Sequence, residues 1–117
     1  MSLQLVFACL VFSTSLGAGQ LLFKLAANDL KVRLAVSWVD AAMSPWLIGA
    51  LALYAASTAL WLYILSQAPL TRVYPFALLG AALVPLLARF ALGEPLPALY
   101  LLGMAVVVAG VAIIQFS

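Results

Sequence analysis

The sequence predicts an all-α integral membrane protein, with four transmembrane helices in an up-down bundle that works as a dimer. Of its 117 residues, 68% are hydrophobic and only 7% are charged, whereas about 25% of the residues of a soluble domain are charged. The apolar residues also fall into four runs, each near the roughly 20 residues that a helix needs to cross a bilayer. We therefore expect residues 1–117 to form a single four-helix transmembrane domain, with helices at about 3–27, 45–67, 72–92 and 96–116.

The first predicted helix, 3–27, carries a polar stripe. Ser13, Gly17, Gln20 and Lys24 are spaced at i, i+4, i+7 and i+11, which places them on one helix face. Such a face lets a ligand or another helix approach closely, and an amide or an ammonium avoids lipid only if it points into the bundle. Gln20 and Lys24 are therefore candidate substrate-binding residues. The alternative for Lys24 is a position near the helix end, from which its side chain snorkels to the interface.

The second predicted helix, 45–67, follows the one sizeable loop that the sequence predicts, at residues 28–44. Pro45 suits the first turn of a helix. Tyr54 and Trp61 then share a face at helical spacing. Aromatic residues of this kind form either a belt at the membrane interface or the wall of a ligand pocket.

The third predicted helix, 72–92, holds Arg72 and Tyr74 at its start and Arg89 towards its end. The breaks on either side of it are short and contain proline, which ends one helix and begins the next. Short connections make neighbouring helices antiparallel and put both termini on one side. We expect Glu94 to neutralise Arg89, and the count of positive charges places the first loop in the cytoplasm.

The fourth predicted helix, 96–116, contains no charged residue. Gly103 and Gly110 are seven residues apart, and Ala109 adds a further small side chain. Small residues let helices pack closely in a membrane. We expect this helix to form a dimer seam, in preference to packing within the chain.

Several functional classes lack the residues they need. The chain has no histidine, one cysteine and three acidic residues, so it offers no cluster with metal-ligand spacing and no pairing of a nucleophile with a base. We expect no enzyme activity, no catalytic residues, no cofactor, no metal and no nucleic-acid partner.

The sequence resembles the drug/metabolite transporter superfamily in its small, four-helix form. The resemblance rests on residues 19–26 (GQLLFKLA), 61–70 (WLYILSQAPL), 73–75 (VYP), 93–95 (GEP) and 103–111 (GMAVVVAGV). One branch, the small multidrug resistance exporters, uses a glutamate in the middle of helix one, and residues 3–27 contain no acid. The G-Q-L-x-x-K-x-A pattern is instead similar to the Arn-type subunits that flip aminoarabinose linked to undecaprenyl phosphate, and to single EamA-like repeats.

The resemblance implies a flippase that moves a polyprenyl-phosphate-linked sugar lipid across the bacterial inner membrane. It would work by alternating access around a polar midplane site, as a homodimer or with a paralogous four-helix subunit. The embedded basic residues suit such an anionic lipid, and the candidate substrate-binding residues are Lys24, Gln20, Trp61, Tyr74, Arg72, Arg89 and Tyr54. The alternatives are an exporter of cations or small metabolites, similar to the small multidrug resistance proteins, and a non-transporting membrane subunit of a glycosyltransferase complex.

Overall fold

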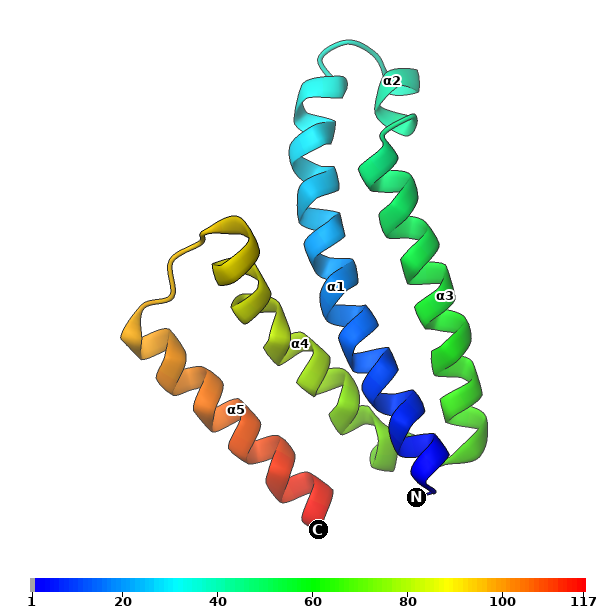
Figure 1. Ribbon diagram of the computed structural model, residues 1–117, viewed down its shortest axis with the longest axis vertical. Coiled ribbons are helices and arrows are strands. Elements are labelled where there is room, and N and C mark those ends of the chain that lie inside the picture. The colour runs from blue at the N-terminus through cyan, green and yellow to red at the C-terminus, as the bar shows by residue number, and fades with distance from the viewer. Residues whose placement is uncertain (1) are drawn as a thin grey trace.

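The computed structural model describes residues 2–117, and within that range the chain is built of helices with no strand (Figure 1). The elements are α1 (Leu3–Arg33), α2 (Trp38–Ala42), α3 (Pro45–Gln67), α4 (Leu70–Leu92) and α5 (Ala98–Phe116). All except the short α2 are long and apolar enough to cross a membrane. The predicted fold class, an all-α membrane protein with four spans, is confirmed. Both termini lie at the same end of the molecule (Figure 1).

The prediction of a loop at 28–44 was wrong in part, because much of this segment is helical. α1 continues to Arg33, and a short second helix covers Trp38–Ala42. The side chain of Arg33 donates to Asp29 at 2.8 Å, one helical turn earlier, and its guanidinium lies 3.6 Å from the carboxylate of Asp40. Ser37 then caps α2 by accepting a hydrogen bond from the backbone N–H of Asp40. These local interactions stabilise helical turns in a stretch whose polarity predicted a loop.

Ser44 connects this polar network to α3. The Ser44 side chain is fully buried, and its hydroxyl donates to Asp29 and accepts from the backbone N–H of Leu47. One serine therefore caps α3 and ties its start to the end of α1. Because α1 extends past residue 27, it also contains an acid, Asp29. This carboxylate lies in the last turns of α1 and is held by Arg33 and Ser44, far from the middle of the helix.

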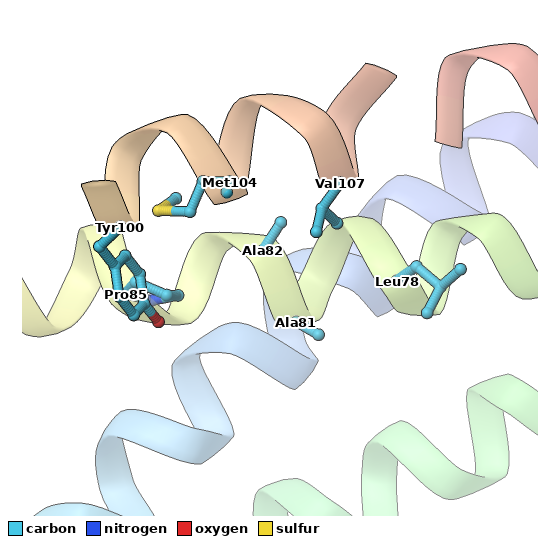
Figure 2. Close-up of a pocket in the computed structure, with 8 residues that line it drawn as sticks. Leu78, Ala81, Ala82, Pro85, Tyr100, Met104 and Val107 are labelled. Carbon is cyan, nitrogen blue, oxygen red and sulfur yellow. The ribbon is translucent and has the colours of Figure 1, made fainter. Parts of the chain in front are cut away.

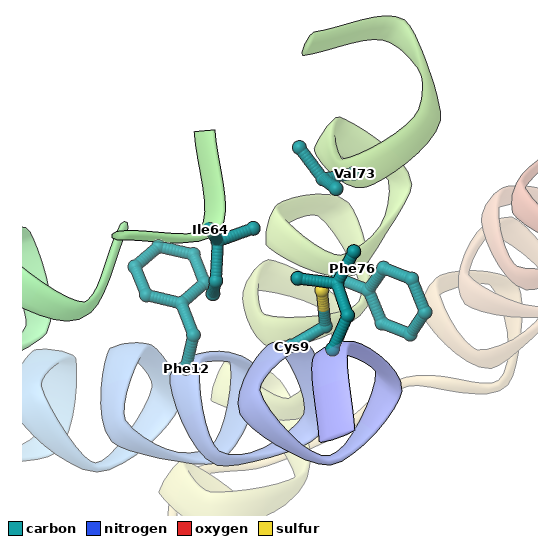
Figure 3. Close-up of a cluster of buried hydrophobic side chains, with 6 residues drawn as sticks. Cys9, Phe12, Ile64, Val73 and Phe76 are labelled. Atoms are coloured by element: carbon teal, nitrogen blue, oxygen red, sulfur yellow. The ribbon is translucent and has the colours of Figure 1, made fainter. Parts of the chain in front are cut away.

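The hydrophobic core lies where α1, α3 and α4 meet (Figure 3), towards the end of the molecule that carries the termini (Figure 1). Cys9 and Phe12 from α1 pack with Ile64 from α3 and with Val73 and Phe76 from α4. The start of α1, the end of α3 and the start of α4 are therefore fixed to one another. The opposite ends of these helices are not held by this core.

α1 and α3 run side by side, whereas α4 and α5 form a second pair whose upper end leans away from α1 (Figure 1). α5 packs mainly on α4, and only Val111 of this helix is buried. Apart from Met104, which is half-buried, its other large apolar side chains are exposed in the single chain, which suits a helix that faces lipid or another subunit.

Candidate functional site

The polar stripe of α1 packs against α4 over half of its length. A Cβ atom built on Gly80 of α4 would lie 2.8 Å from the carbonyl oxygen of Ser13, so only glycine fits this crossing. The Ser13 hydroxyl lies 2.6 Å from the carbonyl oxygen of Phe76 in α4 and 2.9 Å from that of Cys9 in its own helix. Gly17, one turn later, is also buried against α4. Ser13 and Gly17 are thus used for helix packing.

Beyond this crossing the two helices diverge and enclose a cleft of about 180 Å³. We call it the α1–α4 cleft. Gln20 and Lys24, the other half of the polar stripe, line one wall together with Leu21. The opposite wall and the rim are formed by Val84, Ala88, Leu92 and Glu94. The structure therefore brings Gln20 and Lys24 together, and it adds a carboxylate that the sequence did not assign to the site.

The backbone at the end of α4 determines where Glu94 lies. Gly93 has a φ of 69°, a left-handed conformation that glycine adopts without steric cost. The backbone N–H groups of Gly93 and Glu94 both donate to the carbonyl of Ala88, an arrangement that ends many helices. This turn folds the chain back over the last turn of α4 and sets Glu94 on the rim of the cleft.

Glu94 does not pair with Arg89, so that expectation was wrong. Within residues 2–117, the ion pairs closer than 4 Å all involve Arg33. Arg89 follows Ala88, which lines the cleft, and consecutive residues point about 100° apart around a helix. Arg89 therefore projects from another face of α4, while the turn at Gly93 carries Glu94 to the cleft. Lys24 and Glu94 line the same cleft without forming an ion pair with each other.

The α1–α4 cleft lies towards one end of the spans. Lys24 is 21 residues after Leu3, where α1 begins, and at 1.5 Å per residue this corresponds to about 32 Å along the helix. The hydrocarbon core of a bilayer is about 30 Å thick, and Glu94 lies just past the last residue of α4. The cleft therefore lies towards one end of the apolar spans and not at their middle.

The aromatic candidates lie elsewhere. Trp61 stacks on Phe12 with ring centroids 4.6 Å apart, and Tyr74 meets Trp61 edge-on at 6.3 Å. This group lies beside the hydrophobic core. Tyr54 contacts Phe23 edge-on at 6.1 Å, between α3 and α1. None of Tyr54, Trp61 and Tyr74 lines the α1–α4 cleft.

The two arginine candidates are also separate from Lys24. Arg72 lines a cleft of about 350 Å³ with Gln115 and Ser117, at the end of the molecule that carries the termini. Arg89 is exposed on α4. The seven predicted substrate-binding residues therefore do not line a single cleft of the described chain.

The small residues of α5 are not used for close packing within the described chain. A Cβ atom added to Gly103 or to Gly110 would meet nothing within 4 Å. Gly103 lines an apolar groove of about 440 Å³ between α4 and α5, together with Pro85, Tyr100, Met104 and Val107 (Figure 2). Ala109 is six residues from Gly103, a rotation of about 240°, so it lies on another face of α5.

Four apolar spans, with a charged cleft between two of them near one end, define a small multi-pass membrane protein. Comparisons with known proteins give a more specific assignment. The chain is 34% identical over 114 residues to a probable 4-amino-4-deoxy-L-arabinose-phosphoundecaprenol flippase subunit ArnE of Pseudomonas paraeruginosa, covering 97% of this chain and 96% of that protein. The protein of the same name from Pseudomonas aeruginosa is 33% identical over 117 residues, covering 100% of this chain and 99% of that protein.

A further protein of this name, from Pectobacterium atrosepticum, is 34% identical over 111 residues, covering 95% of this chain and 96% of that protein. The chain therefore belongs to the ArnE family of flippase subunits. No model of a known protein family matches the sequence, and no solved structure is significantly similar to it.

Proposed function

We propose that this chain is one subunit of a flippase that moves an amino-sugar lipid, 4-amino-4-deoxy-L-arabinose-phosphoundecaprenol, across the bacterial inner membrane. The observation that carries the proposal is the similarity over nearly the whole length to ArnE subunits. Four apolar helices suit the inner membrane, because proteins that span the bacterial outer membrane are β-barrels. Flipping a lipid requires no covalent chemistry, in keeping with a chain that has no histidine and one cysteine.

The α1–α4 cleft is the best candidate for the site that receives the lipid head group. The phosphate would accept charge-assisted hydrogen bonds from the Lys24 ammonium, and the Gln20 amide would donate a further hydrogen bond from one turn earlier. Apart from Glu94 at the rim, the other lining residues are apolar, and electrostatic attraction is stronger beside apolar walls than in bulk water. Because the cleft lies towards one end of the spans, we place it near a membrane surface. This position suits a loading site, since a lipid phosphate lies at that depth while its polyprenyl tail stays among the acyl chains.

The size of the cleft supports a second subunit. Ligand sites usually enclose about 300–1,000 Å³, and the α1–α4 cleft holds about 180 Å³. We therefore place a partner, either a second copy or a paralogous four-helix subunit, against the open side of this chain. α5 would form part of the seam through Gly103 and Gly110, which share a face and leave open space for an approaching helix.

The test is lipid binding to the purified protein, measured as thermal stabilisation in detergent. A ligand that binds only the folded state raises the apparent stability. Undecaprenyl phosphate should stabilise the wild type, and Lys24→Gln should remove most of this stabilisation. Lys31→Gln is the matched control, because Lys31 is an exposed lysine of α1 outside the cleft.

Either of two results would contradict the proposal. Stabilisation by a quaternary ammonium compound alone would support the cation exporter instead. Equal losses in Lys24→Gln and Lys31→Gln would show that the lipid responds only to net charge and that the cleft is not its site.

A further inference from the structure

The α1–α4 cleft carries a positive side chain, Lys24, on its α1 wall and a negative side chain, Glu94, at its rim. We infer that it is a two-charge site, in which Lys24 binds the phosphate and Glu94 binds a primary ammonium on the same head group. This inference rests on the proposed function and extends it from a site for a lipid phosphate to one that selects an amine-bearing head group. Glu94 would then be the residue that determines specificity for the amino sugar.

The first argument is that the two charged side chains of the cleft, Lys24 and Glu94, have no partner of opposite charge within the described residues. Lys24 and Glu94 are the only charged residues that line the cleft, and within residues 2–117 neither belongs to an ion pair closer than 4 Å. The rest of the lining is apolar apart from Gln20. A ligand with one negative and one positive group would provide each side chain with a partner of opposite charge. A ligand with a phosphate alone would still pair with Lys24, but its negative charge would lie beside Glu94, so it should bind less tightly than one that also carries an ammonium.

The second argument is that the backbone holds Glu94 in place from both sides. Gly93 makes the left-handed turn, and the N–H of Glu94 donates to the carbonyl of Ala88 at 3.3 Å. Pro95 follows directly, and a residue that precedes proline is restricted to extended conformations. The carboxylate therefore projects from a constrained segment, as selective recognition of a charged group requires.

The third argument is the match to the chemistry of the head group. The lipid named for the relatives carries an amine on carbon 4 of its sugar, across the ring from the carbon that bears the phosphate. Its two charges therefore lie at opposite ends of the sugar. The cleft offers matching charges on two different segments, Lys24 on α1 and Glu94 just after α4.

A phosphate together with a primary ammonium also occurs in phosphatidylethanolamine, so the experiment must separate these two sources. The protein is placed in nanodiscs of phosphatidylcholine, which has no primary amine, and affinities are measured at pH 7. The probes are the amino-sugar lipid, a matched lipid with a hydroxyl in place of the amine, and phosphatidylethanolamine.

The wild type should bind the amino-sugar lipid about tenfold more tightly than the hydroxyl lipid, the size of effect expected of one charge-assisted hydrogen bond. Glu94→Gln should abolish this preference and leave the affinity for the hydroxyl lipid unchanged or slightly higher. That retained affinity also shows that the variant is folded. Glu94→Asp should keep part of the preference, and Asp40→Asn, which removes an acid outside the cleft, should keep all of it. Lys24→Gln should weaken binding of both lipids.

The failures of the two proposals are distinguishable. If Glu94→Gln keeps the preference, or weakens binding of both lipids equally, the role of Glu94 is overturned while the proposed function stands. If phosphatidylethanolamine binds as tightly as the amino-sugar lipid, the assignment to an amino sugar is overturned. If the wild type binds neither polyprenyl lipid, the proposed function and this inference both fail.

Discussion

Replacing Gly80 with alanine should destabilise the protein, because this glycine sets how closely α1 and α4 cross. The added methyl group would lie 2.8 Å from the carbonyl oxygen of Ser13 and 3.2–3.3 Å from the side chain of Leu16. The first of these contacts is with backbone, so a side-chain rotation cannot relieve it. α4 must therefore move away from α1.

The magnitude follows from three contributions. Overpacking a tight contact costs about 1–3 kcal/mol. Moving α4 also weakens the hydrogen bond between the Ser13 hydroxyl and the Phe76 carbonyl, now 2.6 Å long, at a cost of about 1 kcal/mol. Alanine gains up to about 1 kcal/mol over glycine as a helix former. The expected net loss is about 1–3 kcal/mol.

The assay is reversible unfolding in mixed micelles, with Gly17→Ala as the matched control. Gly17 is also buried at the crossing, but a Cβ atom there would meet its nearest neighbours at 3.4–3.5 Å, an ordinary contact. Gly17→Ala should leave the free energy of unfolding unchanged or slightly higher. A Gly80→Ala protein as stable as the wild type, or equal losses in the two variants, would refute this description of the crossing.

Three further predictions concern the helix ends and the seam. Ser44→Ala should lower the stability by about 1 kcal/mol, because it removes the cap of α3 and the hydroxyl that donates a hydrogen bond to Asp29. Unfolding in mixed micelles measures this loss, and an unchanged free energy of unfolding would contradict the prediction. Gly93→Ala should lower the stability by about 1 kcal/mol through its left-handed φ alone, since its Cβ would meet nothing within 4 Å. In the same assay, D-alanine introduced at position 93 by chemical synthesis should restore the full stability. A D-alanine protein as unstable as the L-alanine variant would rule out this cause. Gly110→Leu should weaken association of subunits, as followed by light scattering, whereas Gly49→Leu on the exposed face of α3 should not; equal effects would argue against a seam on α5.

Much of the architecture follows from local sequence features. The four spans were predictable because long apolar runs have few other stable arrangements, and the starts and ends marked by Pro45 and by the prolines near residues 69 and 97 agree with the structure. The sequence prediction ended the first helix at residue 27, six residues too early. The polar residues at 28–33 were interpreted as a loop, although Asp29 and Arg33 have helical spacing. That spacing, and Ser37 three residues before Asp40, were signals that could have shown the helical structure.

The candidate site could be predicted only in part. The helical period placed Gln20 and Lys24 on one face with Ser13 and Gly17, but it could not show that α4 covers half of this face and diverges from the other half. That division depends on Gly80, a contact between distant parts of the chain. Glu94 was expected to neutralise Arg89 because the two residues are close in sequence. Gly93, just before Glu94, indicated a left-handed turn that would point the Glu94 side chain elsewhere. That Lys24 lies apart from Arg72 and from the aromatic residues could likewise be known only from the fold.

The most direct test of the central claim is translocation of the amino-sugar lipid in cells. Spheroplasts are prepared from a strain that makes this lipid on the cytoplasmic side but lacks its own ArnE-type subunit, and a membrane-impermeant amine reagent labels the lipid that reaches the outer face. Expression of the wild-type chain should restore labelling, Lys31→Gln should restore it equally, and Lys24→Gln should leave it near the level of the empty strain. A wild type that restores no labelling, or a Lys24→Gln protein that restores all of it, would contradict the assignment of this chain as a flippase subunit that binds its lipid in the α1–α4 cleft.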